Sequence, residues 1–95
     1  MKIRNIHGAS ETTCVCGSWL AHWKKFSGQA ISDCPASGCF NRNLVGAHVR
    51  EGGDSHDLRW YICPLCIWHN MHPGDLEVSD QVRLVSANEK ETCGR

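Results

Sequence analysis

The chain concentrates thiol and imidazole side chains at short spacings, which is the pattern of a metal site. Its 95 residues include seven Cys and six His. Two cysteines bracket a short turn, Cys34-Pro-Ala-Ser-Gly-Cys39, and a second group follows as Cys63-Pro-Leu-Cys66-Ile-Trp-His69. Thiolates and imidazoles are the ligands of tetrahedral Zn²⁺, and two ligands on one tight turn reach the same ion without strain. The sequence therefore predicts a zinc ion that organises the fold.

Two ligand sets satisfy this pattern. The first consists of Cys34, Cys39, Cys66 and His69, and in the second Cys63 replaces His69. We favour the first set, because Cys63 would end a strand whose side chains must point inward. A free Cys in that position is a good small hydrophobic residue. The first set also places its second ligand pair on the first turn of a helix.

A second zinc site is predicted more weakly at the two ends of the chain. Cys14 and Cys16 lie near the start, Cys93 lies near the end, and His22 on an adjacent predicted helix offers a fourth ligand. Such a site would close a loop of nearly the whole chain, which would stabilise a small domain. The alternatives are thiols buried in a core, or a disulfide between Cys93 and either Cys14 or Cys16. We therefore expect one zinc ion and keep a second zinc ion as an alternative.

The length predicts a single domain, 1–95, that needs help to fold. A chain this short buries a modest fraction of its surface, so metals or disulfides usually supplement its core. Met1–Gly8 lacks the apolar stretch of a secretory signal. We therefore expect a cytoplasmic protein, where cysteines more often bind metal than form disulfides. A disulfide-stapled secreted domain is the competing interpretation.

The charge and motif content exclude several function classes. Ten basic and ten acidic residues give no net charge, which is not the basic stripe of a strong non-specific nucleic-acid binder. A membrane-spanning helix would need an apolar run of roughly 18 residues or more, and the sequence has none. We therefore expect no membrane partner. Because no glycine-rich phosphate loop stands out, we also expect no small-molecule cofactor.

The first third of the chain predicts an arm and a helix. Residues 1–12 are polar and predict a loose N-terminal arm or a short strand. Residues 18–28 predict a helix that begins at the N-cap Ser18 and ends at Gly28. Four large apolar residues recur at helical spacing and predict its buried face: Trp19, Leu20, Trp23 and Phe26.

The remaining chain predicts a knuckle, a hairpin and a short helix. The knuckle occupies 33–41, and two strands over 44–50 and 58–63 flank a Gly- and Asp-rich turn. Pro64 is expected to end the second strand. A helix should follow from residue 66 or 67 to about His72, and short strands are expected over 76–78 and 82–85.

This order of elements is that of a treble clef, within an α+β fold. The predicted core covers 34–72, with the N-terminal helix and the short C-terminal strands added to it. The motifs Gly46-Ala47-His48-Val49 and Pro64-Leu65-Cys66-Ile-Trp-His69-Asn70 resemble those of HNH-type (ββα-metal) nucleases. In that family the first motif lies on the first strand of the hairpin, and the second leads into the helix.

The resemblance implies specific roles. Cys66 and His69 would match the structural zinc pair, His48 the general base that activates water, and Asn70 a ligand of Mg²⁺ or Mn²⁺. The family's metal-binding Asp or His before the base is Ala47 here, which cannot ligate a metal, and the hairpin contains no Asn.

We therefore expect a non-catalytic, zinc-binding HNH-like module that binds a macromolecular partner, either protein or nucleic acid. The alternative is a small metal-dependent HNH-type DNA endonuclease with His48 as general base. Trp60 and Trp68 are expected to cover the zinc site and to seal the hairpin against the helix, which would exclude water from the thiolates.

Overall fold

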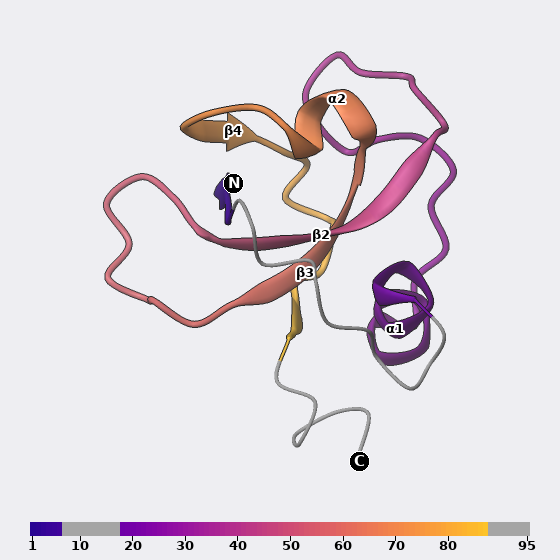
Figure 1. The fold of residues 1–95 in the computed structure, drawn as a ribbon, viewed down its shortest axis with the longest axis horizontal. Helices are drawn as coiled ribbons and strands as arrows, with labels where there is room; N and C mark the ends of the chain where they lie inside the picture. Colours follow the sequence, from indigo (N-terminus) through magenta and orange to yellow (C-terminus); the bar gives the residue numbers. More distant parts are fainter. Residues whose placement is uncertain (7–17, 88–95) are drawn as a thin grey trace.

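The computed structural model of this chain describes residues 1–6 and 18–87. Over these residues the chain forms two helices and five strands (Figure 1), which confirms an α+β fold. In chain order they are β1 (Lys2–Asn5), α1 (Trp19–Ser27), β2 (Leu44–Glu51), β3 (Tyr61–Cys66), α2 (Ile67–Asn70), β4 (Asp75–Glu77) and β5 (Val85–Ser86).

The described strands form one antiparallel sheet in the order β4-β1-β2-β3-β5. The predicted hairpin is its centre: β2 pairs with β3 from Leu44 opposite Cys66 to Val49 opposite Tyr61. Most of the buried residues of the two strands are apolar or cysteine, and they include the β-branched Val49 and Ile62, which suit a pleated surface covered on both faces. Cys66 is thereby held at the end of the longest pairing in the molecule.

The first residues of the chain are part of this sheet rather than a loose arm. Lys2–Asn5 lie between β4 and β2, with Ile3 opposite both Leu76 and Glu51. Ile3 is fully buried. The predicted alternative of a short strand is therefore correct for these residues, because the single buried isoleucine of this polar segment packs in the core. The rest of the predicted arm lies outside the described residues.

Helix α1 has the predicted ends but a different buried face. The Ser18 hydroxyl accepts a hydrogen bond from the Ala21 N–H at 3.0 Å, and Gly28 ends the helix with φ +69°. Trp19 and Trp23 are buried as expected, and His22 and Ser27 are buried with them. Leu20 is half-buried and Phe26 is 38 % exposed, so the buried stripe is rotated toward His22.

Pro64 does not end the second strand, contrary to the sequence-based expectation. It lies fully buried inside β3, opposite Gly46. Proline lacks the N–H that a central strand needs, so it occurs where one side of a strand is unpaired. Among the described residues, β5 pairs only with Tyr61 and Ile62 of β3. The side of β3 away from β2 is therefore unpaired at Pro64, and no ladder hydrogen bond is lost there.

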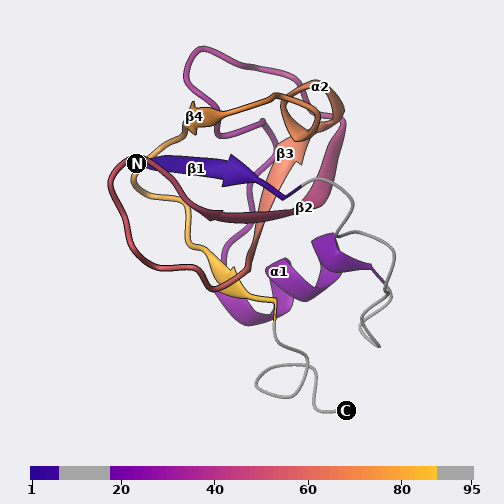
Figure 2. The same ribbon diagram turned by 60° about the vertical axis from the view of Figure 1, so that its left-hand side comes forward.

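The two helices lie on opposite faces of the hairpin, as the two ribbon views show together (Figures 1 and 2). Helix α1 crosses β2 at Gly46, where a Cβ atom would lie 2.4 Å from the Leu20 backbone nitrogen and the Trp19 carbonyl carbon. Only glycine permits this approach. The other face carries α2 and the knuckle, so the sheet separates the metal-ligand end from the aromatic surface beneath α1.

Candidate metal centre

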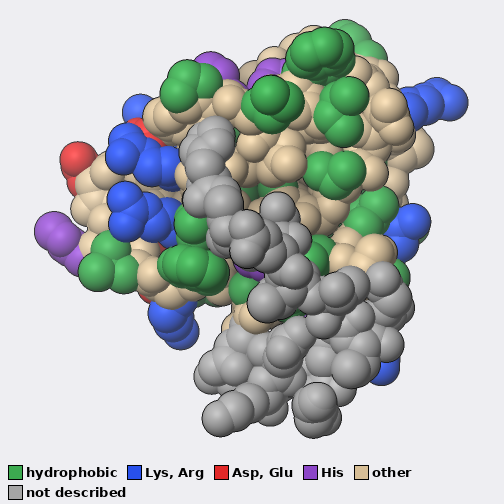
Figure 3. All heavy atoms as spheres, viewed as in Figure 1, with side chains coloured by type: hydrophobic (Ala, Val, Ile, Leu, Met, Phe, Trp, Pro, Cys, Tyr) green, Lys and Arg blue, Asp and Glu red, His purple; other side chains and the backbone are tan. Residues whose placement is uncertain are grey.

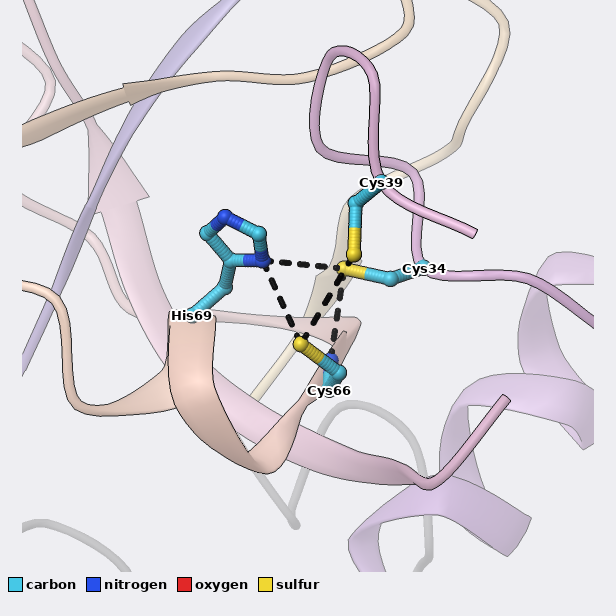
Figure 4. Close-up of side chains that lie close together, drawn as sticks. All are labelled: Cys34, Cys39, Cys66 and His69. Carbon is cyan, nitrogen blue, oxygen red and sulfur yellow. Dashed lines mark hydrogen bonds between the residues drawn. The ribbon is translucent and has the colours of Figure 1, made fainter. Parts of the chain in front are cut away.

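Four potential metal ligands converge at the end of the hairpin that carries α2 (Figure 4). Cys34 and Cys39 come from the loop between α1 and β2, Cys66 is the last residue of β3, and His69 lies in α2. Their ligand atoms, three Sγ atoms and a histidine ring nitrogen, all lie within 4.8 Å of one another. This is the first of the two sets considered from the sequence.

The distances between the ligand atoms match a tetrahedral zinc site. With Zn–S and Zn–N distances of about 2.3 and 2.0 Å, the edges of a tetrahedron are roughly 3.5 to 3.8 Å long. The Sγ atoms of Cys39 and Cys66 are 3.9 Å apart, and the Cys34 Sγ lies 3.6 Å from His69 Nδ1. The Cys66 Sγ lies 3.2 Å from the same nitrogen. The four ligands are therefore spaced to hold one ion.

Backbone N–H groups favour the thiolate form of two of these cysteines. The Cys66 N–H donates to the Cys34 Sγ at 3.3 Å. Burial raises the pKa of the Cys34 thiol to about 11, although this N–H and that of Ala36 oppose the rise. Burial acts to raise the pKa of Cys66, but the N–H groups of His69 and Trp68, together with hydrogen bonds to Cys34 and Cys39, lower this pKa overall. Binding a cation would release the remaining thiol protons.

The knuckle is a tight turn closed by its own backbone. The Cys39 N–H donates to the Ala36 carbonyl at 3.0 Å, and Gly38 adopts φ +73°, a left-handed conformation that suits glycine. The Cys34 N–H donates to the Asn41 carbonyl at 2.8 Å. The turn therefore aims both sulfurs at one point before any ion is considered.

Residues 77–79 contact the knuckle through backbone hydrogen bonds, and no pattern in the sequence predicted this contact. The Ser37 N–H donates to the Glu77 carbonyl and the Ser79 N–H donates to the Pro35 carbonyl, both at 3.0 Å. Ala36 and Val78 are both buried and form a β-bridge. The predicted strand over 76–78 could be recognised from its apolar residues, but its partner could not.

Cys63, the alternative ligand, does not belong to this group. Its side chain is fully buried, and its Sγ donates to the Pro64 carbonyl at 3.7 Å. Burial raises the pKa of this thiol to about 12, so it stays protonated and acts as a small apolar side chain. The described cysteines are free thiols rather than disulfides.

The second predicted zinc site falls mostly outside the described residues, because Cys14, Cys16 and Cys93 lie there. His22 is described: its side chain is fully buried in α1, and its Nε2 lies 2.9 Å from the Ser86 carbonyl oxygen. Its ring also makes an edge contact with Trp19. The second site stays a prediction.

The structure separates the two residues that the nuclease resemblance would pair. His48 points toward α1, where its buried ring contacts Trp19 at a centroid distance of 4.8 Å. Asn70 lies in α2, and its Oδ1 accepts a hydrogen bond of 2.6 Å from the Asn5 side chain. Asn5 is in register with Val49. Because neighbouring residues of a strand point to opposite faces, His48 and Asn70 address opposite sides of the sheet.

The two tryptophans predicted to seal the zinc site do not do so. Trp68 is 69 % exposed, and Trp60 is 50 % exposed. Trp60 makes an edge contact with His48, on the face away from α2. Burial at the metal ligands comes instead from the knuckle and from β3, because Cys34 and Cys66 are both buried while Cys39 is half-buried.

Fold and site together describe a small α+β domain with a Cys₃His cluster at metal-binding distances. Comparison with family models, with curated proteins and with solved structures finds no match. Neither helix in the described part of the chain is long and apolar enough to cross a membrane.

Proposed function

We propose that this protein is a non-catalytic, zinc-stabilised module of the HNH-like treble-clef type that binds a macromolecular partner. One observation carries the proposal. A complete set of four ligands converges at tetrahedral spacing, whereas His48 and Asn70 point to opposite faces of the sheet.

The donor set supports zinc in a structural role. Three thiolates and one imidazole are soft and borderline ligands that favour zinc over the hard cations Mg²⁺ and Ca²⁺. Four protein ligands leave no open coordination position for water or substrate, which is typical of structural sites. The ion would join the knuckle to the junction between β3 and α2, two segments that are far apart in the sequence.

The order of elements supports the treble-clef and HNH-like part of the proposal. A knuckle, a β-hairpin and a short helix follow one another over 34–70, and the helix carries the last ligand. The catalytic half of the resemblance has less support. The Oδ1 of Asn70 already accepts a hydrogen bond from Asn5, and His48 is buried against Trp19. A cation bound by Asn70 would lie on the opposite face of the sheet from a water molecule activated by His48.

Exposed apolar side chains near the cluster support a binding role. Figure 3 shows hydrophobic side chains gathered at the end of the molecule that carries α2. Phe40 lies in the knuckle, next to Cys39, and is 80 % exposed, while Trp68 and Met71 are each 69 % exposed. Large exposed aromatic residues are typical anchors of macromolecular interfaces. The free thiols of the described cysteines fit the reducing cytoplasm that we propose as its location.

Metal analysis of protein purified under reducing conditions tests the proposal. We expect Cys66→Ser to lose one equivalent of zinc relative to the natural chain, and Cys63→Ala to lose none, because Cys63 lies outside the cluster. Replacement by Co²⁺ should give the intense thiolate-to-metal absorption of a tetrahedral sulfur-rich site. Zinc-free protein that is folded as well as the metal-loaded form would refute the proposal.

A cleavage assay tests the non-catalytic part. Plasmid DNA incubated with the zinc-loaded protein and Mg²⁺ or Mn²⁺ should remain supercoiled. Nicking that disappears in His48→Ala but persists in the matched surface variant His56→Ala would establish the nuclease alternative instead.

A further inference from the structure

A shallow hollow on the sheet face away from α2 brings two arginines beside a tryptophan. Arg4 of β1 and Arg50 of β2 are direct cross-strand partners, so their side chains leave the sheet on the same face. A hollow of about 300 Å³ is lined by these two residues and by Asn5, Ile6 and Trp60. Figure 3 shows Lys and Arg side chains grouped on the side of the molecule that carries the turn between β2 and β3.

The arginine pair is unfavourable without a negative partner. Like charges directly opposite each other on two strands repel and destabilise the pairing. Arg4 is partly neutralised, because its Nε donates to the Asp75 carboxylate at 3.1 Å. Arg50 makes no ion pair with any described residue. One half-buried guanidinium is therefore left to receive an anion from outside the chain.

The nearby carboxylates are not among the residues that line this hollow. They line a second hollow of about 120 Å³, which shares both arginines and is formed in part by Glu51, Asp57 and Asp75. Each already has partners: Asp75 binds the Gly53 N–H and Arg4, Asp57 binds Arg59 and Tyr61, and Glu51 accepts from the Ser55 hydroxyl. The lining of the hollow beside Trp60 therefore has two guanidinium groups, of which that of Arg4 is paired with Asp75, and no carboxylate.

Trp60 gives this hollow an aromatic surface. Its ring is held edge-on by the buried His48, at a centroid distance of 6.4 Å and an interplanar angle of 82°. Half of the side chain remains exposed. A fixed indole beside guanidinium groups offers stacking for a planar ring together with charge-assisted hydrogen bonds for an oxyanion. A ligand that joins a phosphate to a flat base would use both features, the guanidinium groups for the phosphate and the indole for the base.

We infer that this hollow is a binding site for a nucleotide unit, with Arg50 and Arg4 on the phosphate and Trp60 stacked on the base. The unit would be a free nucleotide or one residue of a single-stranded nucleic acid, since both present the same chemistry. The inference deepens the proposed function, because it names the partner, and it lies on the opposite face of the sheet from Asn70.

Titrations of the zinc-loaded full chain test the site, followed by chemical-shift changes at the Trp60 and Arg50 resonances. The probes are inorganic phosphate, adenosine monophosphate and a short single-stranded oligodeoxyadenylate. Arg50→Gln should weaken binding of all three by about tenfold, the usual effect of losing a charge-assisted hydrogen bond. Trp60→Leu should weaken the two base-containing probes by a similar factor and leave phosphate binding unchanged.

Arg42→Gln is the matched control, because Arg42 is an exposed arginine that lies outside the hollow. It should bind every probe as the natural chain does. Oligonucleotide binding should weaken as salt rises, and Arg50→Gln should reduce the slope of log K against log salt by about 1.

The outcomes separate the two sources of the ligand. Equal affinity for the mononucleotide and for the oligonucleotide would identify a nucleotide site, and much tighter oligonucleotide binding would identify a single-strand site. Absence of binding, or binding that neither Arg50→Gln nor Trp60→Leu weakens, would overturn the inference. Zinc content and unfolding are measured on the same samples, so a protein that holds zinc but binds no probe refutes this inference alone.

Discussion

Two regions on opposite faces of the sheet contain metal-binding side chains in very different arrangements. At the α2 end, three cysteines and His69 place their ligand atoms within 4.8 Å of one another. Beneath α1, the buried imidazoles of His22 and His48 each make an edge contact with Trp19, at centroid distances of 4.9 and 4.8 Å. The Nδ1 atom of His48 has no hydrogen-bond partner in the described part of the chain.

The comparison shows that burial of metal-binding residues does not by itself make a metal centre. The cluster residues sit in a turn, at a strand end and in a short helix, positions from which side chains can converge. His22 and His48 lie inside a helix and a strand, where they pack as aromatic rings against Trp19. The first region has ligand atoms spaced to hold an ion, and the second is held by close packing between a helix and a sheet.

Removal of the metal should have the largest effect and should act through the first region. Structural zinc contributes of the order of 10 kcal/mol in small zinc domains. We expect chelation, or Cys66→Ser, to abolish the cooperative thermal unfolding transition measured by circular dichroism. Cys63→Ala removes a buried thiol outside the cluster and should keep the transition, at a cost of about 1 kcal/mol. A cooperative transition of unchanged midpoint in zinc-free protein would contradict this view of the first region.

Gly46→Ala should damage the second region and leave the first intact. The added Cβ would meet the backbone of Trp19 and Leu20 at 2.4 Å, so α1 must move away from β2. We expect a loss of about 3 kcal/mol or more in the free energy of unfolding by urea, with zinc retained. Gly74→Ala is the control: unlike Gly46, Gly74 has a positive φ, but its added Cβ would meet nothing within 4 Å, so only about 1 kcal/mol of backbone strain is expected. Equal losses in the two variants would argue against the close approach of α1.

The pH dependence of stability should separate the two regions further. Burial, and then the charge of His22, lower the pKa of His48 below 6.5. The folded protein therefore prefers neutral His48, so its contribution is fully present above pH 6.5 and is lost as the pH falls toward the lower folded pKa. Each unit of pKa depression corresponds to about 1.4 kcal/mol.

His48→Leu should therefore lose less stability than the natural chain does when the pH is lowered below 6.5. Protonation of the zinc ligands affects both proteins, so the difference between them isolates His48. The exposed His56, replaced by Leu, should leave the pH profile unchanged. Parallel profiles for His48→Leu and the natural chain would show that the imidazole is not held neutral by the fold.

The smallest expected effect concerns the start of α1. Ser18→Ala removes the hydroxyl that accepts from the Ala21 N–H and should reduce the free energy of unfolding by about 1 kcal/mol. Ser18→Asp should recover most of this loss, because aspartate also caps helices. The zinc content of both variants should be that of the natural chain. A Ser18→Asp variant as unstable as Ser18→Ala would argue against capping as the cause.

Local patterns in the sequence predicted the features that depend on neighbours along the chain. The caps Ser18 and Gly28, the hairpin of β2 and β3, and the ligand set of Cys34, Cys39, Cys66 and His69 follow from residue types at short spacings. Short spacings restrict geometry directly, because a turn or a helix places residues a few positions apart at known distances. The choice of His69 over Cys63 rested on placing Cys63 at the end of the second strand, whereas the structure places it inside β3 with its side chain buried outside the ligand group.

Tertiary structure decided what depends on residues far apart in the chain. Lys2–Asn5 form an inner strand because they pair with β2 on one side and with β4 on the other. Pro64 can lie inside β3 because β5 is short and does not pair with this position. The separation of His48 from Asn70 depends on which face each helix covers, and no local pattern specifies that. The sequence by itself determined the types and spacings of the ligands, whereas the pairing of distant strands determined which side chains share a face.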